Sequence, residues 1–298
     1  MELSISRRSF LQQSAVGAAV MAVLGTPADA LPWPAALRRA ADIKVGGTDW
    51  NLGTEGKIGA FALAKDSTLE GVQVSLGGRG VKEMVRLPMC DPDRQKQWLE
   101  ESRKTGMTIG GTCLEILHQD NLKDHANGPK WVEQSIGATK ALGTTVVLLP
   151  FFGKQQIKER AEQNAVAERL KVLAPLAEKE GVVLGLENTI SAEDNAWILD
   201  QVGSKAVSVY YDVGNSFNQK YDVHKEIAWL GKDRVCQLHI KDNPNFLGKG
   251  PIDLPKFIEA VLKSGFAGWA MLETVCPTKD VKADFTVNAA YVRELLKK

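Results

Sequence analysis

The chain has 298 residues, of which 44% are hydrophobic and 24% charged, and its formal net charge is +1. This balance argues against a nucleic-acid-binding surface, for which a strong positive excess would be expected. The four cysteines are too irregularly spaced for a disulfide framework or a C-x-x-C metal site, so we expect small core residues, with a bridge between Cys90 and Cys113 left open.

Residues 1–30 have the pattern of a twin-arginine signal peptide. The pair Arg7-Arg8 precedes an apolar stretch that runs from Ala15 to Leu24, and a small-x-small cleavage site ends at Ala30. The apolar stretch is shorter than the roughly 20 residues that a membrane-spanning helix needs. We therefore predict export to the periplasm by the twin-arginine pathway, cleavage after Ala30 and no stable membrane span in the mature chain. An uncleaved amino-terminal anchor is the alternative.

The rest of the chain predicts a single domain. Residues 31–41 include Pro32 and Pro34 and are expected to form a linker, so that the domain covers residues 42–298. This length is close to the roughly 250 residues of one eight-stranded α/β barrel.

In the first half of the domain, short apolar runs predict four strands separated by amphipathic helices. The predicted strands cover residues 43–46, 69–76, 108–113 and 145–150. The predicted helices cover residues 91–106, 129–142 and 156–181. The first of these helices begins at Asp91-Pro92, a capping residue followed by proline, and the last ends at Gly181, the residue type common just past a helix.

In the second half, four predicted strands each end in a side chain that can bind a divalent metal. They cover residues 182–187, 207–212, 235–239 and 269–273. Their last residues are Glu187, Asp212, His239 and Glu273, separated by 25, 27 and 34 positions. These separations are close to the roughly 30 residues of one strand-helix-strand unit. Helices are expected from about residue 191 and over residues 222–230, 253–264 and 283–297.

Strands that alternate with helices should be parallel, so their carboxyl ends should meet at one rim. A count of eight strands and eight helices, with no bounds assigned to the helix after the first strand, predicts an α/β fold of the (β/α)8 TIM-barrel type. Because side chains alternate along a strand, Tyr210, Gln237 and Met271 should point into the barrel with the four ligands, and Leu186 and Leu238 should face the helices.

Three carboxylates and one imidazole at one rim would repel each other unless a cation lay among them. Such a donor set suits one hard or borderline divalent ion in near-octahedral geometry, with Mn²⁺ as first choice and Mg²⁺, Co²⁺ or Zn²⁺ as alternatives. Each residue taken alone could be only a polar strand end. Four such ends at the spacing of one structural unit favour a metal site.

The motifs around these ligands resemble the xylose isomerase-like TIM-barrel superfamily. The runs are Leu-Glu-Asn at 186–188, Tyr-Asp-Val-Gly-Asn at 211–215, Leu-His-Ile-Lys-Asp at 238–242 and Leu-Glu-Thr at 272–274. The match is to the sugar isomerase/epimerase branch, which includes D-tagatose 3-epimerase, hydroxypyruvate isomerase and inosose dehydratase. The resemblance implies a divalent-metal-dependent sugar or keto-sugar isomerase or epimerase that works through a metal-stabilised enediolate. Glu187 and Glu273 would each be both metal ligand and acid/base.

Five further residues are candidates for substrate binding. Glu193 lies where relatives hold a substrate hydroxyl, although a carboxylate at a helix amino terminus explains it equally well. Asn215 stands where many relatives have histidine, so it can hydrogen-bond a hydroxyl but cannot transfer a proton near neutral pH. Lys241 could reach a substrate oxygen or extend into solvent. His118 and Trp50 follow the third and first strands and could contact substrate or only pack.

Other functions remain as alternatives. A metal-dependent lyase or dehydratase acting on a keto-sugar, an inosose or a 3-keto-glycoside could use the same enediolate to expel a neighbouring oxygen. A non-catalytic sugar-binding protein and an abasic-site endonuclease are weaker alternatives, because both acid/base glutamates are present and the chain has only four histidines. The expected partner is a small sugar, with no nucleic acid, and a homo-oligomer is left open.

Overall fold

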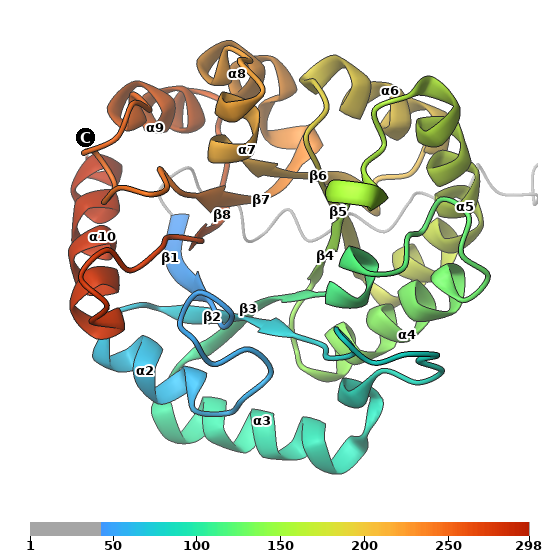
Figure 1. Cartoon of the computed structure of the whole chain (residues 1–298), viewed down its shortest axis with the longest axis horizontal. Helices are drawn as coiled ribbons and strands as arrows, with labels where there is room; N and C mark the ends of the chain where they lie inside the picture. Colours follow the sequence, from blue (N-terminus) through green and yellow to red (C-terminus); the bar gives the residue numbers. More distant parts are fainter. Residues whose placement is uncertain (1–42, 298) are drawn as a thin grey trace, which may run out of the picture. The chain divides into compact units, whose positions relative to one another are not determined.

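Eight strands pair in parallel, in the order of the chain, and close into a barrel in which β8 returns to pair with β1. The structure is a computed structural model that describes residues 43–297, so the predicted signal peptide and the linker over residues 31–41 lie outside the described residues. Figure 1 shows the strands at the centre of a ring of helices. The predicted (β/α)8 TIM barrel is therefore confirmed.

Each predicted strand is present, with bounds that differ by at most two residues at either end. The strands are β1 (Ile43–Thr48), β2 (Gly71–Ser75), β3 (Thr108–Cys113), β4 (Val146–Pro150), β5 (Val183–Glu187), β6 (Val207–Asp212), β7 (Val235–Ile240) and β8 (Gly268–Leu272). The metal-ligand candidates consequently lie at the ends of four adjacent strands, as the parallel arrangement predicts.

The predicted helices are also present. They are α3 (Pro92–Thr105), α4 (Gly128–Ala141), α5 (Arg160–Glu180), α6 (Ala192–Val202), α8 (Val223–Arg234), α9 (Leu254–Lys263) and α10 (Val281–Leu296). Asp91 caps α3 and Ser191 caps α6, and the left-handed Gly106 and Gly181 follow α3 and α5. Helical geometry in α8 is interrupted at Gly231, next to the predicted end of that helix.

The prediction did not locate two short helices, α2 (Ala60–Asp66) and α7 (Val213–Asn218). Each is at most seven residues long, too short for a helical period to show in the sequence. Helix α2 also begins at Gly59 without a side-chain cap. Three single turns of 3-10 helix are present as well, η2 (Pro88–Cys90), η3 (Glu115–His118) and η4 (Gly153–Gln155).

The barrel interior is crossed by hydrogen bonds between strands on opposite sides. The Tyr210 hydroxyl on β6 donates to Gln73 Oε1 on β2 over 3.0 Å, and Gln237 Nε2 on β7 donates to the carbonyl of Gly110 on β3 over 2.6 Å. Tyr210 and Gln237 therefore point inward, as predicted from strand alternation.

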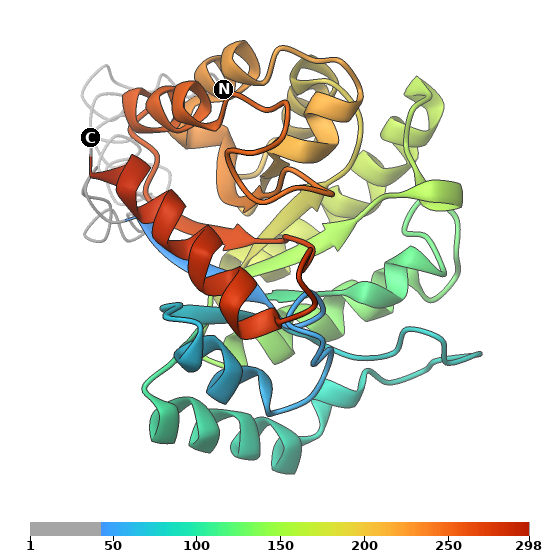
Figure 2. The same ribbon diagram turned by 60° about the vertical axis from the view of Figure 1, so that its left-hand side comes forward.

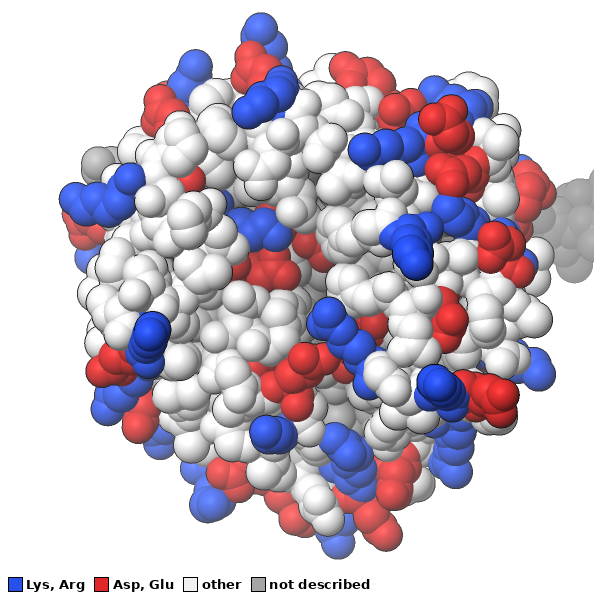
Figure 3. Space-filling view, in the orientation of Figure 1, with Lys and Arg blue, Asp and Glu red and all other residues white. Residues whose placement is uncertain are grey.

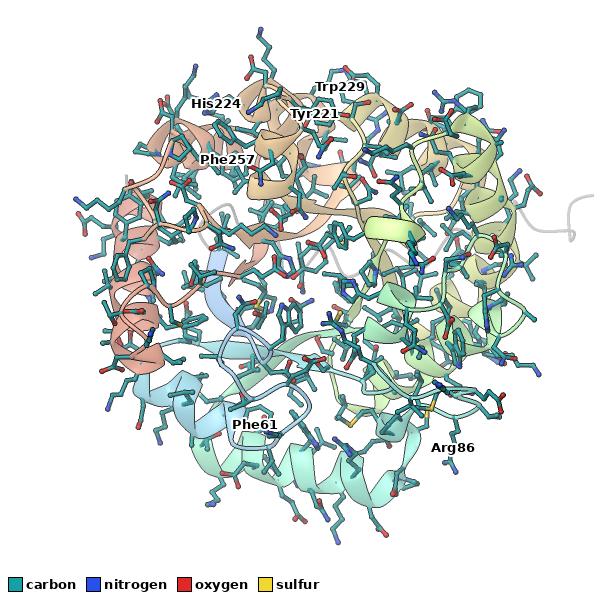
Figure 4. The ribbon with its side chains drawn as sticks, viewed as in Figure 1. Phe61, Arg86, Tyr221, His224, Trp229 and Phe257 are labelled. Atoms are coloured by element: carbon teal, nitrogen blue, oxygen red, sulfur yellow. The ribbon has the colours of Figure 1, made fainter. Side chains whose placement is uncertain are left out.

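The outward-facing set packs under the helices. Leu186, Val209, Leu238 and Leu272 all belong to the hydrophobic core that joins strands to helices. Phe257 of α9 stacks on Tyr211 of β6, and Phe61 of α2 contacts Trp98 of α3 edge-on. Figure 4 shows Phe61 and Phe257 at different places in the ring, each beside its own helix. In Figure 2, α10 lies along the outside of the barrel across β1. This continuous core fixes the strand ends on which the site depends.

The cysteines do not form a bridge in the structure. Cys90 and Cys113 are both free thiols, and Cys113 is buried at the end of β3. Among residues 43–297, no helix is long and apolar enough to cross a membrane.

Glycines on β1 to β3 make room for the large side chains of β8. A Cβ atom at Gly71 would lie 2.5 Å from the backbone oxygen of Thr108 and 2.6 Å from the Trp269 ring. The backbone oxygen belongs to the neighbouring strand and cannot move without disturbing the ladder. Gly137, by contrast, is exposed on α4 and has open space around it.

Gly71→Ala is expected to lower the free energy of unfolding by about 1–3 kcal/mol, because the added methyl overpacks the interior. Gly137→Ala should leave it unchanged or raise it by up to about 1 kcal/mol, because alanine is the better helix former. Urea denaturation followed by circular dichroism measures both. Equal stability of the two variants would contradict this account of the interior.

Candidate active site

The four predicted ligands come together at the carboxyl end of the barrel. Glu187, Asp212, His239 and Glu273 each offer one donor atom, and these atoms all lie within 4.8 Å of one another. His239 is fully buried, Glu187 and Asp212 are each 3% exposed, and Glu273 is partly exposed. Figure 3 shows acidic and basic side chains side by side in the hollow at the centre of the ring.

His239 Nδ1 is the centre of the cluster. It lies 3.0 Å from Glu187 Oε1, 3.6 Å from Glu273 Oε2 and 3.7 Å from Asp212 Oδ2. Three carboxylates from β5, β6 and the end of β8 therefore face one imidazole nitrogen.

Lys241 lies two residues after His239 and joins two of the same carboxylates. Its Nζ is 2.7 Å from Asp212 Oδ2 and 2.5 Å from Glu273 Oε2. Gly214 provides the space for its aliphatic chain, since a Cβ atom at that position would lie 2.5 Å from Lys241 Cγ. The absence of a side chain at Gly214 thus allows Lys241 to pack there, which the sequence alone did not reveal.

Helix α7 orients Asp212. Asp212 Oδ1 accepts the backbone N–H of Asn215 over 2.8 Å and so caps the helix, which directs Oδ2 into the cluster. The Asn215 side chain donates to Glu187 Oε1 over 3.3 Å. Asn215 therefore donates to two predicted ligands, with its side chain to Glu187 and with its backbone N–H to Asp212. Its predicted contact with substrate stays a prediction.

Trp50 orients Glu273. Its indole N–H, on the loop after β1, donates to Glu273 Oε1 over 3.0 Å, and its ring meets His239 edge-on. Glu273 thus has one oxygen bound by the indole and the other by Lys241. Trp50 is only half-buried, so the same side chain also forms part of the mouth, and its predicted role in substrate binding stays open to test.

The other predicted substrate residues lie farther out. His118 on η3 stacks on Phe152 at the same rim, where burial and the nearby Arg79 lower its pKa to about 4. It is therefore neutral at physiological pH and suited to packing or hydrogen bonding. Glu193 is exposed in the first turn of α6, a position that fits its alternative interpretation as a helix amino-terminal carboxylate. His224, in the first turn of α8 at the outside of the ring (Figure 4), is not part of the site.

The sequence did not predict two buried carboxylates at the β1 to β3 side of the mouth. Asp49 accepts hydrogen bonds from Ser75 N, Ser75 Oγ and Gly56 N. Glu115 accepts the backbone N–H groups of Leu76 and Gly77. Burial raises the pKa of Asp49 to about 6 and that of Glu115 to about 8. Both side chains fix the loops that follow neighbouring strands.

The charges of the cluster shift its pKa values strongly. Burial raises the pKa of Glu187 to about 7, against the opposing effect of His239. Burial alone would lower the pKa of His239, but the carboxylates of Glu187 and Glu273 outweigh it and raise that pKa to about 10. For Asp212, burial is outweighed by Lys241 and His239, which lower its pKa. A divalent cation that binds here would displace the protons that His239 and Glu187 hold.

The donor set fits a divalent metal. Three carboxylate oxygens and one imidazole nitrogen converge from four strand ends, and oxygen and imidazole donors are those that Mn²⁺, Mg²⁺, Co²⁺ and Zn²⁺ accept. The excess negative charge of the carboxylates supplies the attraction. These four residues are therefore the ones that would hold a divalent ion.

The chain is similar in sequence to a known protein family and to a curated epimerase. A model of the family described as xylose isomerase-like TIM barrel matches residues 61–295. A curated relative from Actinoplanes sp., 2-epi-5-epi-valiolone 7-phosphate 2-epimerase, is 26% identical over 214 residues, which are 70% of this chain and 76% of the relative.

Solved structures of epimerases share the fold. The 3-keto-D-glucoside 4-epimerase of E. coli has a TM-score of 0.67 at 16% identity, covering 85% of this chain and all of that chain. L-ribulose 3-epimerase has a TM-score of 0.68 at 16% identity, covering 86% of this chain and 95% of that one. At these identities the likeness extends to the barrel and carries no information on substrate.

Mn²⁺ affinity is expected to rise with pH, by about tenfold per unit between pH 7 and 9, because the ion must displace the proton that His239 holds up to a pKa of about 10. Below pH 7 the slope should steepen, since Glu187, with a pKa of about 7, then also carries a proton. Isothermal titration calorimetry with the metal-free protein measures this. His224→Asn, a change outside the site, should keep the slope, and an affinity independent of pH would refute the assigned ligands.

Proposed function

This chain belongs to the xylose isomerase-like TIM barrel family, and from that membership we propose that it is a metal-dependent isomerase or epimerase of a sugar or keto-sugar. The observation that carries the proposal is the meeting of four ligand-type side chains within 4.8 Å at the carboxyl end of the barrel, where barrel enzymes hold their active sites. The comparisons support an isomerase/epimerase, the enzyme class expected from the sequence.

A substrate with a carbonyl next to a hydroxyl fits this arrangement. The relatives are named as epimerases of a valiolone phosphate, a 3-keto-D-glucoside and L-ribulose, and these names all denote ketones. When bound, a divalent ion supplies a Lewis acid that polarises the carbonyl and acidifies the neighbouring C–H bond. We propose Mn²⁺ for this site on the chemistry of its oxygen and imidazole donors.

Glu187 is placed to move a proton to and from substrate. Burial raises the pKa of its carboxyl in the metal-free protein, which favours proton uptake relative to a solvated glutamate. Within the described residues, the polar contacts that His239 and Asn215 make with its carboxylate are both to Oε1. Oε2 is therefore the oxygen that would take a proton from substrate carbon.

Glu273 lies at the end of β8, and Glu187 lies at the end of β5. They are therefore at opposite edges of the four adjacent strands that carry the donors. Its two carboxylate oxygens are held by Trp50 and Lys241, which fixes the direction from which it could return a proton. In this proposal one glutamate removes the proton and the other returns it on the other face of the carbon, which inverts the centre.

Lys241 provides a positive charge beside the reacting atoms. Its ammonium is mostly buried, and although burial lowers its pKa, Asp212 and Glu273 outweigh this and raise it. Lys241 therefore stays charged, and it can stabilise the oxygen on which negative charge develops as the C–H bond breaks.

The proposed setting is the periplasm. The twin-arginine pattern of residues 1–30 suits a protein that folds and takes up its metal before export. Export of a fusion of residues 1–30 to a reporter, compared with the Arg7→Lys, Arg8→Lys double variant, tests this part independently of the chemistry.

Glu187→Gln and Glu273→Gln are each expected to reduce turnover by about 10²–10⁴, because each removes one proton-transfer group. The assay incubates the Mn²⁺-loaded protein with 3-keto-glucosides and ketoses in D₂O and follows deuterium uptake and new epimers by NMR. Glu168→Gln, an exposed change on α5, should have no effect.

Normal turnover by both glutamine variants at saturating metal would refute their assigned roles. Release of an aglycone or appearance of an enone, without a new epimer, would instead identify the lyase or dehydratase considered from the sequence.

A further inference from the structure

We infer that Gln73 on β2 is a positioning residue that fixes the tautomer of His239 and so presents the Nδ1 lone pair to the metal. The inference rests on the proposed function, because it concerns the same metal site. Gln73 was not among the residues that the sequence singled out. It lies in a short buried strand, and its polar side chain is fully buried inside the barrel.

The orientation of the Gln73 amide follows from its neighbour on β3. Gln73 Nε2 lies 3.4 Å from the backbone oxygen of Thr112. A carbonyl oxygen can only accept a hydrogen bond, so the NH₂ end of the amide must face Thr112. The Oε1 end therefore faces β6 and β7 across the barrel.

Two groups donate to Gln73 Oε1. The Tyr210 hydroxyl lies 3.0 Å away and His239 Nε2 lies 2.8 Å away. A carbonyl oxygen has two lone pairs, so it can accept both bonds. Since Oε1 cannot donate, Nε2 must be the nitrogen that carries the hydrogen.

The consequence for the metal site follows from the chemistry of imidazole. In a neutral ring only one nitrogen carries hydrogen, so hydrogen on Nε2 leaves the lone pair on Nδ1. Nδ1 is the nitrogen that faces Glu187, Asp212 and Glu273. The opposite tautomer would direct an N–H group at the ion. Outer hydrogen bonds of this kind typically change metal affinity by about 10–100-fold.

Three variants separate this role from a merely structural one. Gln73→Met keeps the size of the side chain but removes the acceptor. Gln73→Glu keeps the acceptor, because a carboxyl oxygen accepts the Nε2 hydrogen of His239 in either protonation state. Tyr210→Phe removes the other donor to Gln73 and leaves the bond to His239 in place.

The experiment titrates the metal-free full chain with Mn²⁺ by calorimetry, without substrate. Gln73→Met is expected to weaken binding about 10–100-fold, the range typical of lost outer contacts. Tyr210→Phe should stay close to the wild-type affinity, and Gln73→Glu should bind Mn²⁺ no more weakly than the wild type. Equal affinity of wild type and Gln73→Met would overturn the inference and leave the proposed function standing, whereas a wild type that binds no divalent metal would overturn both.

A second measurement tests the tautomer itself. In the Cd²⁺-loaded wild type, ¹⁵N NMR of the His239 ring, assigned with His239→Gln, should show hydrogen on Nε2 and cadmium coupling to Nδ1. Cadmium coupling to Nε2 would overturn the inference whether or not Gln73→Met folds.

Discussion

The structure depends on keeping three carboxylates and an imidazole together in a poorly hydrated mouth. Repulsion among such carboxylates must be offset by positive charge, because burial removes the water that would screen them. Lys241 supplies part of that charge, through ion pairs of 2.7 Å with Asp212 and 2.5 Å with Glu273. A divalent cation among the donors would supply the rest. The hydrogen bonds to Asp212, His239 and Glu273 from surrounding residues direct their donor atoms toward one point.

The barrel assigns different tasks to its two halves. The second half, β5 to β8, carries the four donors at adjacent strand ends. The first half supports them: the loop after β1 provides the indole that holds Glu273, and β2 provides the amide that holds His239. The two halves meet across the interior, because opposite strands of a closed barrel face one another.

The strands and the position of the four ligands could be predicted from the sequence, because they follow from the length of the apolar runs and the spacing of the ligand residues. Apolar runs gave the strands, and ligand residues repeated at the length of one structural unit gave the site at their carboxyl ends. The support of that site could not be predicted in the same way. Gln73 is one polar residue in a short strand. Its importance arises from its contacts with Tyr210 and His239, which lie 137 and 166 positions farther along the chain. Asp49 and Glu115 likewise bind backbone groups of loops whose path only the fold determines.

The hydrogen bonds that span the barrel interior, from Tyr210 to Gln73 and from Gln237 to Gly110, tie facing walls together just beneath the donor atoms. The strands that carry three of the donors are held at fixed positions around the closed sheet. Under the proposed function, the position of the metal donors would depend mainly on the barrel and the contacts to the sugar mainly on the loops above it, so that the two properties could change independently in evolution.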